Sequence, residues 1–406
     1  MKLRSAIGRA PGRLDVLGGV SDYSGALVLE TPIRAQTRVG IQEIEASELR
    51  FASRTHGEWE LSLAALPALL ELSSEQLRAE LETLAAPRWA RYLFGCLWVL
   101  CLAKAVQPRT GLSIRALESV PVGVGVSSSA ALEIATLRAL ARVMRSRFDG
   151  TELARLGQRA ENEVVGAPCG LMDQLTSAFG RPGRLLPIRC QPDVLLKPVA
   201  LPRGVTVVGW NSAAAHSVGG SAYGVARTAA FMGKRILEGL AGSRIGHAAD
   251  VPPSVLMRHE SQIPETIPGR TYLRDFSAVD DPLSRIDPKQ SYPVRAALRF
   301  ASHEDRRSRL AVQLLSAQGP GGEDRLREIG ELMYQSHEGY RQIGLGHERT
   351  DQIVNEVRRL GPENGFYGAR SSGGGAGGTV VVLMRKRSAA ILRDLAGPEN
   401  VIPAAT

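Results

Sequence analysis

The segment from Pro121 to Ala131 constrains this chain more than any other part of its sequence. It reads Pro-Val-Gly-Val-Gly-Val-Ser-Ser-Ser-Ala-Ala, so that Gly123 and Gly125 precede three serines at the start of a helical pattern. Glycines let a backbone approach an anion closely, and the free N–H groups at a helix start attract phosphate. The segment therefore predicts a phosphate cradle between a strand and a helix. It is not a Walker A loop, because no Gly-Lys-Ser or Gly-Lys-Thr follows. A glycine-rich turn with a serine N-cap is the alternative interpretation.

Hydrophobic periodicity places this segment in a chain of mixed strands and helices. Strands are predicted over residues 4–8, 26–33, 36–41, 112–116, 204–210 and 379–384, and helices over 73–84, 88–105, 130–144 and 152–165. A turn is predicted at residues 10–12, and the aromatic residues of the 88–105 helix are expected in the core. A length of 406 residues exceeds what one core usually serves, so we expect two domains, residues 1–200 and 201–406.

Composition excludes several classes of protein. The net charge is +9, yet only six of the 50 basic residues are Lys, and the Arg residues are scattered rather than gathered in a stripe with aromatics. This pattern argues against a nucleic-acid partner and favours small anionic substrates. The longest mostly apolar stretch, residues 93–103, is too short to span a bilayer, and the chain starts without a signal-peptide pattern. The four cysteines form no C-x-x-C pair. We therefore expect a cytoplasmic protein with free thiols and no membrane partner, and the oligomeric state stays open.

Two further segments carry chemistry. In Ala160–Gln174, a glycine and a proline separate Glu161 on one predicted helix from Asp173 at the start of the next. Two carboxylates on either side of a tight turn can converge, one for a metal and one for a hydroxyl proton. A helix-surface Glu and a first-turn Asp are the alternative. In Gly368–Thr379, six glycines favour close backbone approach to a ligand over a flexible loop, which remains the other possibility.

The order of these segments resembles one enzyme family. Residues 10–25, Ala-Pro-Gly-Arg-Leu-Asp-Val-Leu-Gly-Gly-Val-Ser-Asp-Tyr-Ser-Gly, resemble the first motif of galactokinase-like GHMP kinases. The serine segment resembles their second motif and the glycines at 373–378 their third, with the acidic segment between. The resemblance implies an α+β fold of two domains, ribosomal-protein-S5-like at the N-terminus and ferredoxin-like at the C-terminus, with the site between them. It also implies ATP and Mg²⁺ as cofactors.

The same resemblance implies roles for residues of the phosphate and catalytic sites. Asp173 matches the catalytic aspartate and Arg13 its partner arginine. Ser129 and Glu161 match the ligands of Mg²⁺, hard oxygen donors that suit this ion. The residues that match the ATP phosphate loop are Gly123, Gly125, Ser127, Ser128 and Ser129.

The residues that match the sugar-binding positions are Gly19, Asp22, Gly170 and Tyr223. Within the family, residues 18–25, 264–269, 330–337, 344–351 and the region of His216 resemble the L-arabinokinases. Galactokinases carry Glu-His where this chain has Gly19-Val20, and that Glu reaches the 6-hydroxyl of galactose. L-Arabinopyranose lacks this exocyclic group, so a sugar-1-kinase for L-arabinose is the function predicted. The alternatives are a galactokinase or another sugar-1-kinase, and, from another class, a non-catalytic sensor of sugar and ATP.

Overall fold

The computed structural model describes residues 3–214 and 221–406, and backbone contacts divide the chain into two compact units. Unit 1 comprises residues 1–13, 32–122 and 127–180, and unit 2 comprises residues 14–31, 123–126 and 181–406. Two short segments of the N-terminal half thus pack with the C-terminal half. These units are defined by contacts and not by the domains of a family, so the domain boundary expected after residue 200 stays a prediction.

The sheet of unit 1 is built on a strand longer than predicted. β2 (Leu27–Ile44) is one strand where the sequence predicts two, and its C-terminal part pairs with β5 (Gly111–Glu118). β3 (Glu48–Ser53) pairs in parallel with β5, and β4 (Gly57–Ser62) pairs antiparallel with β3. Alternate residues of β2, such as Val39 and Ile41, are buried, which is the period expected of a strand with one face on the core.

The turn predicted at residues 10–12 is wrong, because β1 (Ser5–Leu17) continues through Pro11. Among the described strands β1 pairs only with β2, so it lies at a sheet edge. Proline lacks an N–H donor and is tolerated in edge strands, where one side of the backbone needs no partner. The strand therefore continues to Arg13 and beyond.

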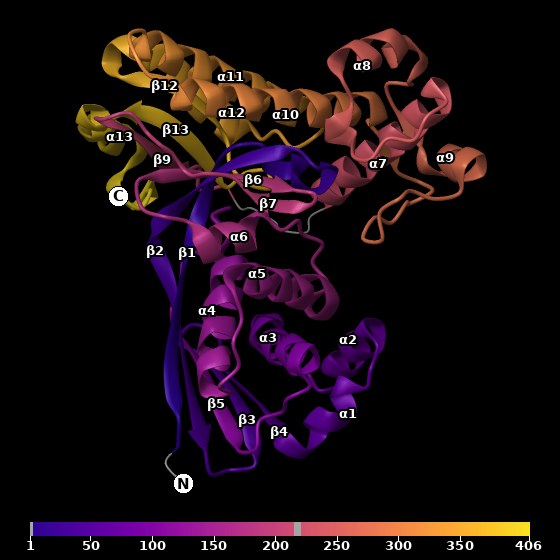
Figure 1. The fold of residues 1–406 in the computed structure, drawn as a ribbon, viewed down its shortest axis with the longest axis vertical. Helices are drawn as coiled ribbons and strands as arrows, with labels where there is room; N and C mark the ends of the chain where they lie inside the picture. The colour runs from indigo at the N-terminus through magenta and orange to yellow at the C-terminus, as the bar shows by residue number, and fades with distance from the viewer. Residues whose placement is uncertain (1–2, 215–220) are drawn as a thin grey trace. The chain divides into compact units, whose positions relative to one another are not determined.

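Helices cover one face of this sheet (Figure 1). α1 (Leu66–Leu70) and α2 (Ser74–Thr83) lead to α3 (Arg88–Lys104), which packs beside α4 (Ser128–Val143). α5 (Gly150–Arg159), η3 (Ala160–Val165) and α6 (Met172–Phe179) follow. The aromatic helix α3 does lie in the core: Phe94 is fully buried and meets Phe51 of β3 with ring centroids 6.2 Å apart. Aromatic burial of this kind dominates core energetics.

Unit 2 contains a four-stranded antiparallel sheet in the order β12 (Phe366–Ser371), β13 (Thr379–Arg385), β9 (Val205–Asn211), β14 (Val401–Pro403). α11 (Gly322–Gln342) and α12 (Glu348–Leu360) pack on it, and α13 (Ala389–Ala396) follows β13. β13 is central and fully buried from Val380 to Val382, which explains its continuous apolar sequence.

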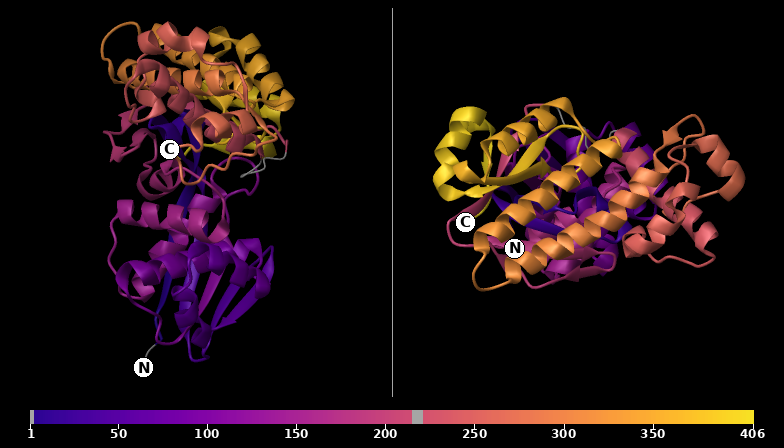
Figure 2. Two further views of the ribbon diagram at one scale, coloured as in Figure 1. Left: turned by 90° about the vertical axis from the view of Figure 1, so that its right-hand side faces the viewer. Right: turned by 90° about the horizontal axis from the view of Figure 1, so that it is seen from above.

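A second layer of unit 2 packs around α7 (Ser221–Ala241) and α10 (Val294–Ser316). Figure 2 shows α10 and α11 side by side. Shorter elements complete the unit: β6 (Arg184–Cys190), β7 (Asp193–Leu195), β8 (Val199–Ala200), α8 (Pro253–His259), β10 (Ile267–Pro268), α9 (Gly269–Phe276) and β11 (Ser291–Tyr292). Over the described part of the chain, no helix has both the length and the apolar character needed to cross a bilayer.

Candidate active site

The serine segment forms the loop-to-helix transition that its sequence predicts. Gly123 and Gly125 both have a φ of 77°, in the left-handed region that favours glycine. Ser127 is the N-cap of α4, and Ser128 and Ser129 are its first residues. The N–H groups of this first turn lack partners within the helix, so they are available to an anion.

Ser127 holds a backbone conformation that is unusual for serine, with φ 57° and ψ 52°. Such left-handed non-glycine residues cost about 1–3 kcal/mol and gather at functional sites. In this conformation the Ser127 hydroxyl donates to Oδ2 of Asp173 over 2.5 Å. Ser127 thus connects the predicted phosphate loop to Asp173, the candidate catalytic carboxylate.

Asp173 also forms a two-pronged ion pair with Arg13. Nε of Arg13 donates to Oδ1 over 2.8 Å, and Nη2 donates to Oδ2 over 3.0 Å. β1 carries Arg13, which is buried, and the first turn of α6 carries Asp173, whose side chain keeps 23% of its exposure. Bidentate pairing fixes the carboxylate in one orientation. The remaining exposure leaves Asp173 able to meet a substrate hydroxyl.

Glu161 lies on η3, a π-helical turn that follows α5 directly. Such turns are rare and frequent at functional sites. Its buried carboxylate accepts a hydrogen bond from Nε2 of Gln174 over 3.0 Å, and the Ser129 hydroxyl also hydrogen-bonds to it. Burial and the negative charge of Asp173 raise the pKa of Glu161, although hydrogen bonds from its neighbours, Ser129 among them, oppose that shift.

Glu133 of α4 is a second fully buried carboxylate beside Glu161. The same Nε2 of Gln174 donates to Oε2 of Glu133 over 3.0 Å, and Oε1 of Glu133 finds no hydrogen-bond partner among the described residues. Burial and the charge of Glu161 raise the pKa of Glu133 well above its ordinary value. Arg13, Ser127, Ser129, Glu133, Glu161, Asp173 and Gln174 are called the Asp173 group below.

The Asp173 group fits a divalent cation. It gathers three carboxylates against a single arginine, and the ligands expected for Mg²⁺, Ser129 and Glu161, hydrogen-bond to one another. In the described part of the chain no three His, Cys, Asp or Glu side chains form a complete metal site. Proteins usually hold Mg²⁺ through one or two carboxylates together with substrate phosphates, and Glu161 with Ser129 would supply oxygen donors of that kind.

Gly170 also belongs to unit 1. It is buried in the segment that leads into α6, directly after Cys169. The backbone N–H of Cys169 donates to Oδ1 of Asn162 over 2.8 Å. The Asn162 side chain, one residue from Glu161, thereby fixes the backbone next to Gly170.

In unit 2, Gly19 and Asp22 lie on the short helical turn η1 (Gly19–Ser24). Gly18, at the start of this turn, donates its N–H to Oε1 of Glu304 over 2.9 Å. Leu27, just beyond its end, donates its N–H to Oδ1 of Asp305 over 2.9 Å. Two neighbouring carboxylates of α10 therefore hold both ends of the turn. Asp22 is buried within it.

Tyr223 lies on α7 in the same unit and is partly buried. Its ring meets that of Tyr23 edge-to-face, with centroids 5.9 Å apart. Tyr23 is the residue after Asp22, so the structure brings Tyr223 close to the turn that carries two of the other sugar candidates. His216, whose region belongs to the resemblance, lies outside the described residues.

The glycine run after β12 is packed rather than open. Gly373, Gly375, Gly377 and Gly378 all have positive φ, and Ala376 between them does too. Ala376 donates its N–H to the carbonyl of Leu345 over 2.8 Å. The conformation favours glycine, and the hydrogen bond of Ala376 to Leu345 opposes the alternative of a flexible loop.

The sequence did not predict the places of Glu133 and Gln174 in the Asp173 group, or of Glu304 at the start of η1. It also did not predict that Asp15, Tyr340 and Arg370 surround Gly19, where each has an atom within 2.8 Å of an ideal Cβ position, or that Asp15 forms an ion pair with Arg370. Glu133 had a usable signal, because it is a charged residue among the apolar positions of α4 and is fully buried there. Asp15 and Arg370 lie inside quoted motifs. Nothing local in the sequence indicates that they pair.

Known proteins resemble the whole of this chain. The family models described as "GHMP kinases N terminal domain" and "GHMP kinases C terminal" match residues 91–181 and 322–397. A galactokinase of Roseiflexus sp. (strain RS-1) is 31% identical over 366 residues, which cover 89% of this chain and 79% of that protein. The chain belongs to the GHMP kinase family. An L-arabinokinase of Arabidopsis thaliana is 32% identical to this GHMP kinase over 428 residues. That match covers 90% of the chain but only 41% of the length of the plant protein.

Solved structures support the fold. The galactokinase of Lactococcus lactis, solved with galactose, matches with a TM-score of 0.75 at 18% identity and covers 99% of this chain and 94% of its own. The mevalonate kinase of Methanococcus jannaschii matches with a TM-score of 0.60 at 15% identity and covers 99% of both chains. The two-domain GHMP kinase fold predicted from the motifs is therefore confirmed.

Proposed function

We propose that this GHMP kinase is an ATP-dependent sugar-1-kinase acting on L-arabinose. The γ-phosphoryl group of ATP passes to the anomeric hydroxyl, so that an O–P bond forms at C1 and the bond between the β- and γ-phosphates breaks. The products are β-L-arabinose 1-phosphate and ADP. The observation that carries the sugar assignment is Gly19, which has no side chain where galactokinases place a carboxylate, and the similarity to an L-arabinokinase supports it.

Asp173 is proposed to accept the hydroxyl proton or assist its loss electrostatically. Its residual exposure and its fixed orientation support this role. Arg13 is proposed to keep Asp173 ionised and to stabilise charge on the transferred group. Phosphoryl transfer requires mainly positioning and charge stabilisation, and this pair supplies both.

ATP is proposed to place its phosphates on the loop of Gly123, Gly125 and Ser127–Ser129. The free N–H groups at the start of α4 support this assignment. Ser129 and Glu161 are proposed to hold Mg²⁺, which would neutralise phosphate charge when bound. Asp22, Gly170 and Tyr223 are the proposed contacts to sugar hydroxyls.

A galactokinase is the second candidate. The similarity to the Roseiflexus galactokinase extends over 79% of that protein, whereas the similarity to the L-arabinokinase extends over 41% of that one. A pocket that merely lacks a hydrogen-bond partner for the 6-hydroxyl does not strongly exclude D-galactose. A non-catalytic sensor is disfavoured, since such a protein is expected to lose the serine loop or Asp173. The proposed partners are therefore sugar and ATP, and a cytoplasmic location stays part of the proposal.

A comparison of sugars tests the proposal. L-Arabinose should have a higher kcat/KM than D-galactose, because a buried 6-hydroxyl without a partner costs about 1–3 kcal/mol, or roughly 5- to 150-fold. The measurement is ADP release over a panel of sugars, with the product identified by NMR. If D-galactose has the higher kcat/KM, the galactokinase candidate replaces this one.

The converse variant, Gly19→Glu with Val20→His, is not a usable test. Gly19 has a φ of 49°, and a Cβ there would lie 1.9 Å from the Tyr340 hydroxyl. The galactokinase pair would therefore fail for lack of space whatever the sugar preference, so the wild-type comparison is decisive.

A further inference from the structure

The space around Gly19 is filled by three polar side chains of unit 2. An ideal Cβ at this position would lie 1.9 Å from the Tyr340 hydroxyl, and 2.8 Å from both Nη2 of Arg370 and Oδ2 of Asp15. Real Cβ atoms essentially never come so close to other atoms. Any side chain at position 19 must therefore displace this cluster, in addition to adopting a positive φ.

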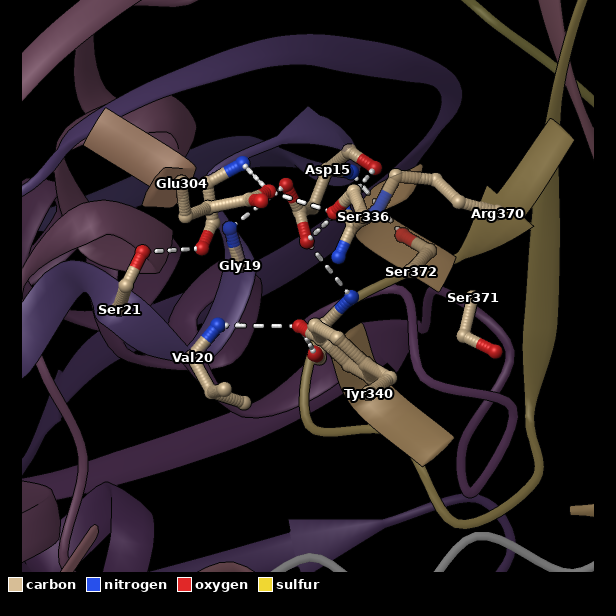
Figure 3. Close-up of polar contacts among 12 residues, drawn as sticks. Asp15, Gly19, Val20, Ser21, Glu304, Ser336, Tyr340, Arg370, Ser371 and Ser372 are labelled. Carbon is tan, nitrogen blue, oxygen red and sulfur yellow. Dashed lines mark hydrogen bonds and ion pairs between the residues drawn. The ribbon is translucent and has the colours of Figure 1, made fainter. Parts of the chain in front are cut away.

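Tyr340 cannot move aside easily. The residue is fully buried, and its hydroxyl accepts the N–H of Val20 over 3.0 Å and donates to the carbonyl of Gly373 over 2.6 Å (Figure 3). The guanidinium of Arg370 lies 4.7 Å from the centre of the Tyr340 ring. A displaced hydroxyl would leave buried backbone groups without partners on both sides, which is costly.

Asp15 ties the same two backbone segments together. Its Oδ1 accepts the N–H of Gly19 over 3.1 Å, and its Oδ2 accepts the N–H of Gly373 over 3.1 Å and Nη1 of Arg370 over 2.7 Å. Asp15 and Arg370 are both fully buried, and Figure 3 shows their side chains beside Gly19. Asp15, Gly19, Val20, Tyr340, Arg370 and Gly373 are called the Asp15 network below.

We propose that Tyr340 is a specificity-determining residue of the sugar site. Through its hydroxyl it restricts position 19 to glycine and sets the position of the turn that carries Gly19 and Asp22. This inference rests on the proposed function in so far as that turn contacts the sugar. Tyr340 is a positioning residue, because it acts through the backbone of Val20 and Gly373 and needs no contact with the substrate.

A double-mutant cycle tests the steric part. Gly19→Ala should lower the unfolding midpoint by at least about 3 °C more than Gly183→Ala, which also has a positive φ but has open space around its Cβ position. In a Tyr340→Phe background the loss caused by Gly19→Ala should shrink, since the nearest atom is gone. An equal loss in both backgrounds, or a loss no larger than that of Gly183→Ala, overturns the proposal.

Kinetics of the single variant Tyr340→Phe test the specificity part, even if Gly19→Ala does not fold. The KM for the sugar that the wild type uses better should rise about 5- to 10-fold, with kcat at saturating sugar within about twofold. The kcat/KM ratio of L-arabinose to D-galactose should move toward one. Tyr272→Phe is the matched control, because Tyr272 is equally buried in unit 2 and its hydroxyl, among the described residues, donates a single long hydrogen bond of 3.5 Å to the carbonyl of Ala278.

An unchanged ratio of kcat/KM between the two sugars, or a fall of kcat for both sugars with KM unchanged, overturns the proposal. The outcome is separable from that of the proposed function. If the wild type prefers D-galactose, the L-arabinose assignment fails, while the change of ratio in Tyr340→Phe still decides the role of Tyr340.

Discussion

The Asp173 group of unit 1 and the Asp15 network of unit 2 each centre on an arginine paired with an aspartate, yet they differ in what surrounds the pair. Arg370 and Asp15 are both fully buried, and the Asp15 carboxylate also accepts hydrogen bonds from the backbone N–H groups of Gly19 and Gly373. Asp173 keeps part of its exposure, and its other partner is the side chain of strained Ser127. The first arrangement holds backbone in place, and the second keeps a carboxylate ready for a ligand.

Charge balance separates the two clusters further. In the Asp15 network the carboxylate faces Arg370, and the neighbouring Glu304 has Arg307 as its own partner. In the Asp173 group, Glu133 and Glu161 add two buried carboxyl groups without adding a cation, and burial raises the pKa of both. An excess of buried charge is expensive unless a ligand compensates it. The comparison therefore predicts that breaking the Asp15–Arg370 pair acts mainly on stability, and that changing Asp173 or Glu161 acts mainly on turnover.

The largest effect is expected for Asp15→Ala. Removing one partner of a buried ion pair leaves Arg370 uncompensated and should lower the free energy of unfolding by about 3–5 kcal/mol. Urea denaturation followed by circular dichroism measures it. Asp275→Ala is the control, because Asp275 pairs with Arg274 at the surface, where solvent screens the pair, and its loss should change the free energy of unfolding far less. Similar losses in the two variants would contradict the comparison.

Asp173→Asn should act on turnover instead. We expect kcat to fall by at least about 10²-fold, because the amide cannot accept the proton, with ATP binding nearly intact. Steady-state kinetics and calorimetric ATP titration measure the two quantities. Wild-type turnover in this variant would remove Asp173 from the reaction.

Glu161→Gln should raise the Mg²⁺ concentration needed for half-maximal activity by roughly tenfold. Binding of sugar alone should change little, since the ion is held by protein and phosphate oxygens together. Glu163→Gln serves as the control, because Glu163 follows on the same turn but pairs with Arg159. An unchanged Mg²⁺ titration for Glu161→Gln would exclude it as a ligand.

The smallest effect is expected from His337 of α11, whose Nε2 lies 3.0 Å from Oδ1 of Asp351. Burial lowers the pKa of His337, although the charge of Asp351 opposes the shift. The unfolded chain therefore binds the proton more tightly. The contribution of neutral His337 to stability is complete above about pH 6.5 and is lost as the pH falls through its folded pKa. Unfolding free energies of wild type and His337→Gln, measured from pH 7.5 to 5, should differ in slope, and parallel slopes would refute this.

The sequence predicted best what local patterns control. The bounds of two helices and one central strand were predicted to within two residues, because each has a clear helical period or apolar run. These elements are Arg88–Lys104, Ser128–Val143 and Thr379–Arg385. The π-helical turn at Glu161 was predicted as a continuation of α5. A single wide turn adds too few residues to disturb a helical pattern, so periodicity could not reveal it.

The Asp15 network escaped prediction for a different reason. Asp15 and Arg370 lie 355 residues apart, and a lone aspartate or arginine in a sequence gives no sign of its partner. The resemblance to GHMP kinases identified Gly19 and Asp22 as candidates. It gave no information about the side chains that hold their turn, since packing between distant elements is absent from any local motif.

The membership of residues 14–31 in unit 2 has a consequence for how the protein is made. The partners of this turn, Glu304, Tyr340 and Arg370, lie in the last third of the sequence. At about 5–20 residues per second, a ribosome needs roughly 20–70 s to travel the 355 residues from Asp15 to Arg370. The η1 turn is among the first segments synthesised and cannot acquire these native contacts until nearly all of the chain exists. During this interval the Gly19 turn lacks the hydrogen bonds of Glu304, Tyr340 and Arg370, so the nascent chain is then most exposed to misfolding.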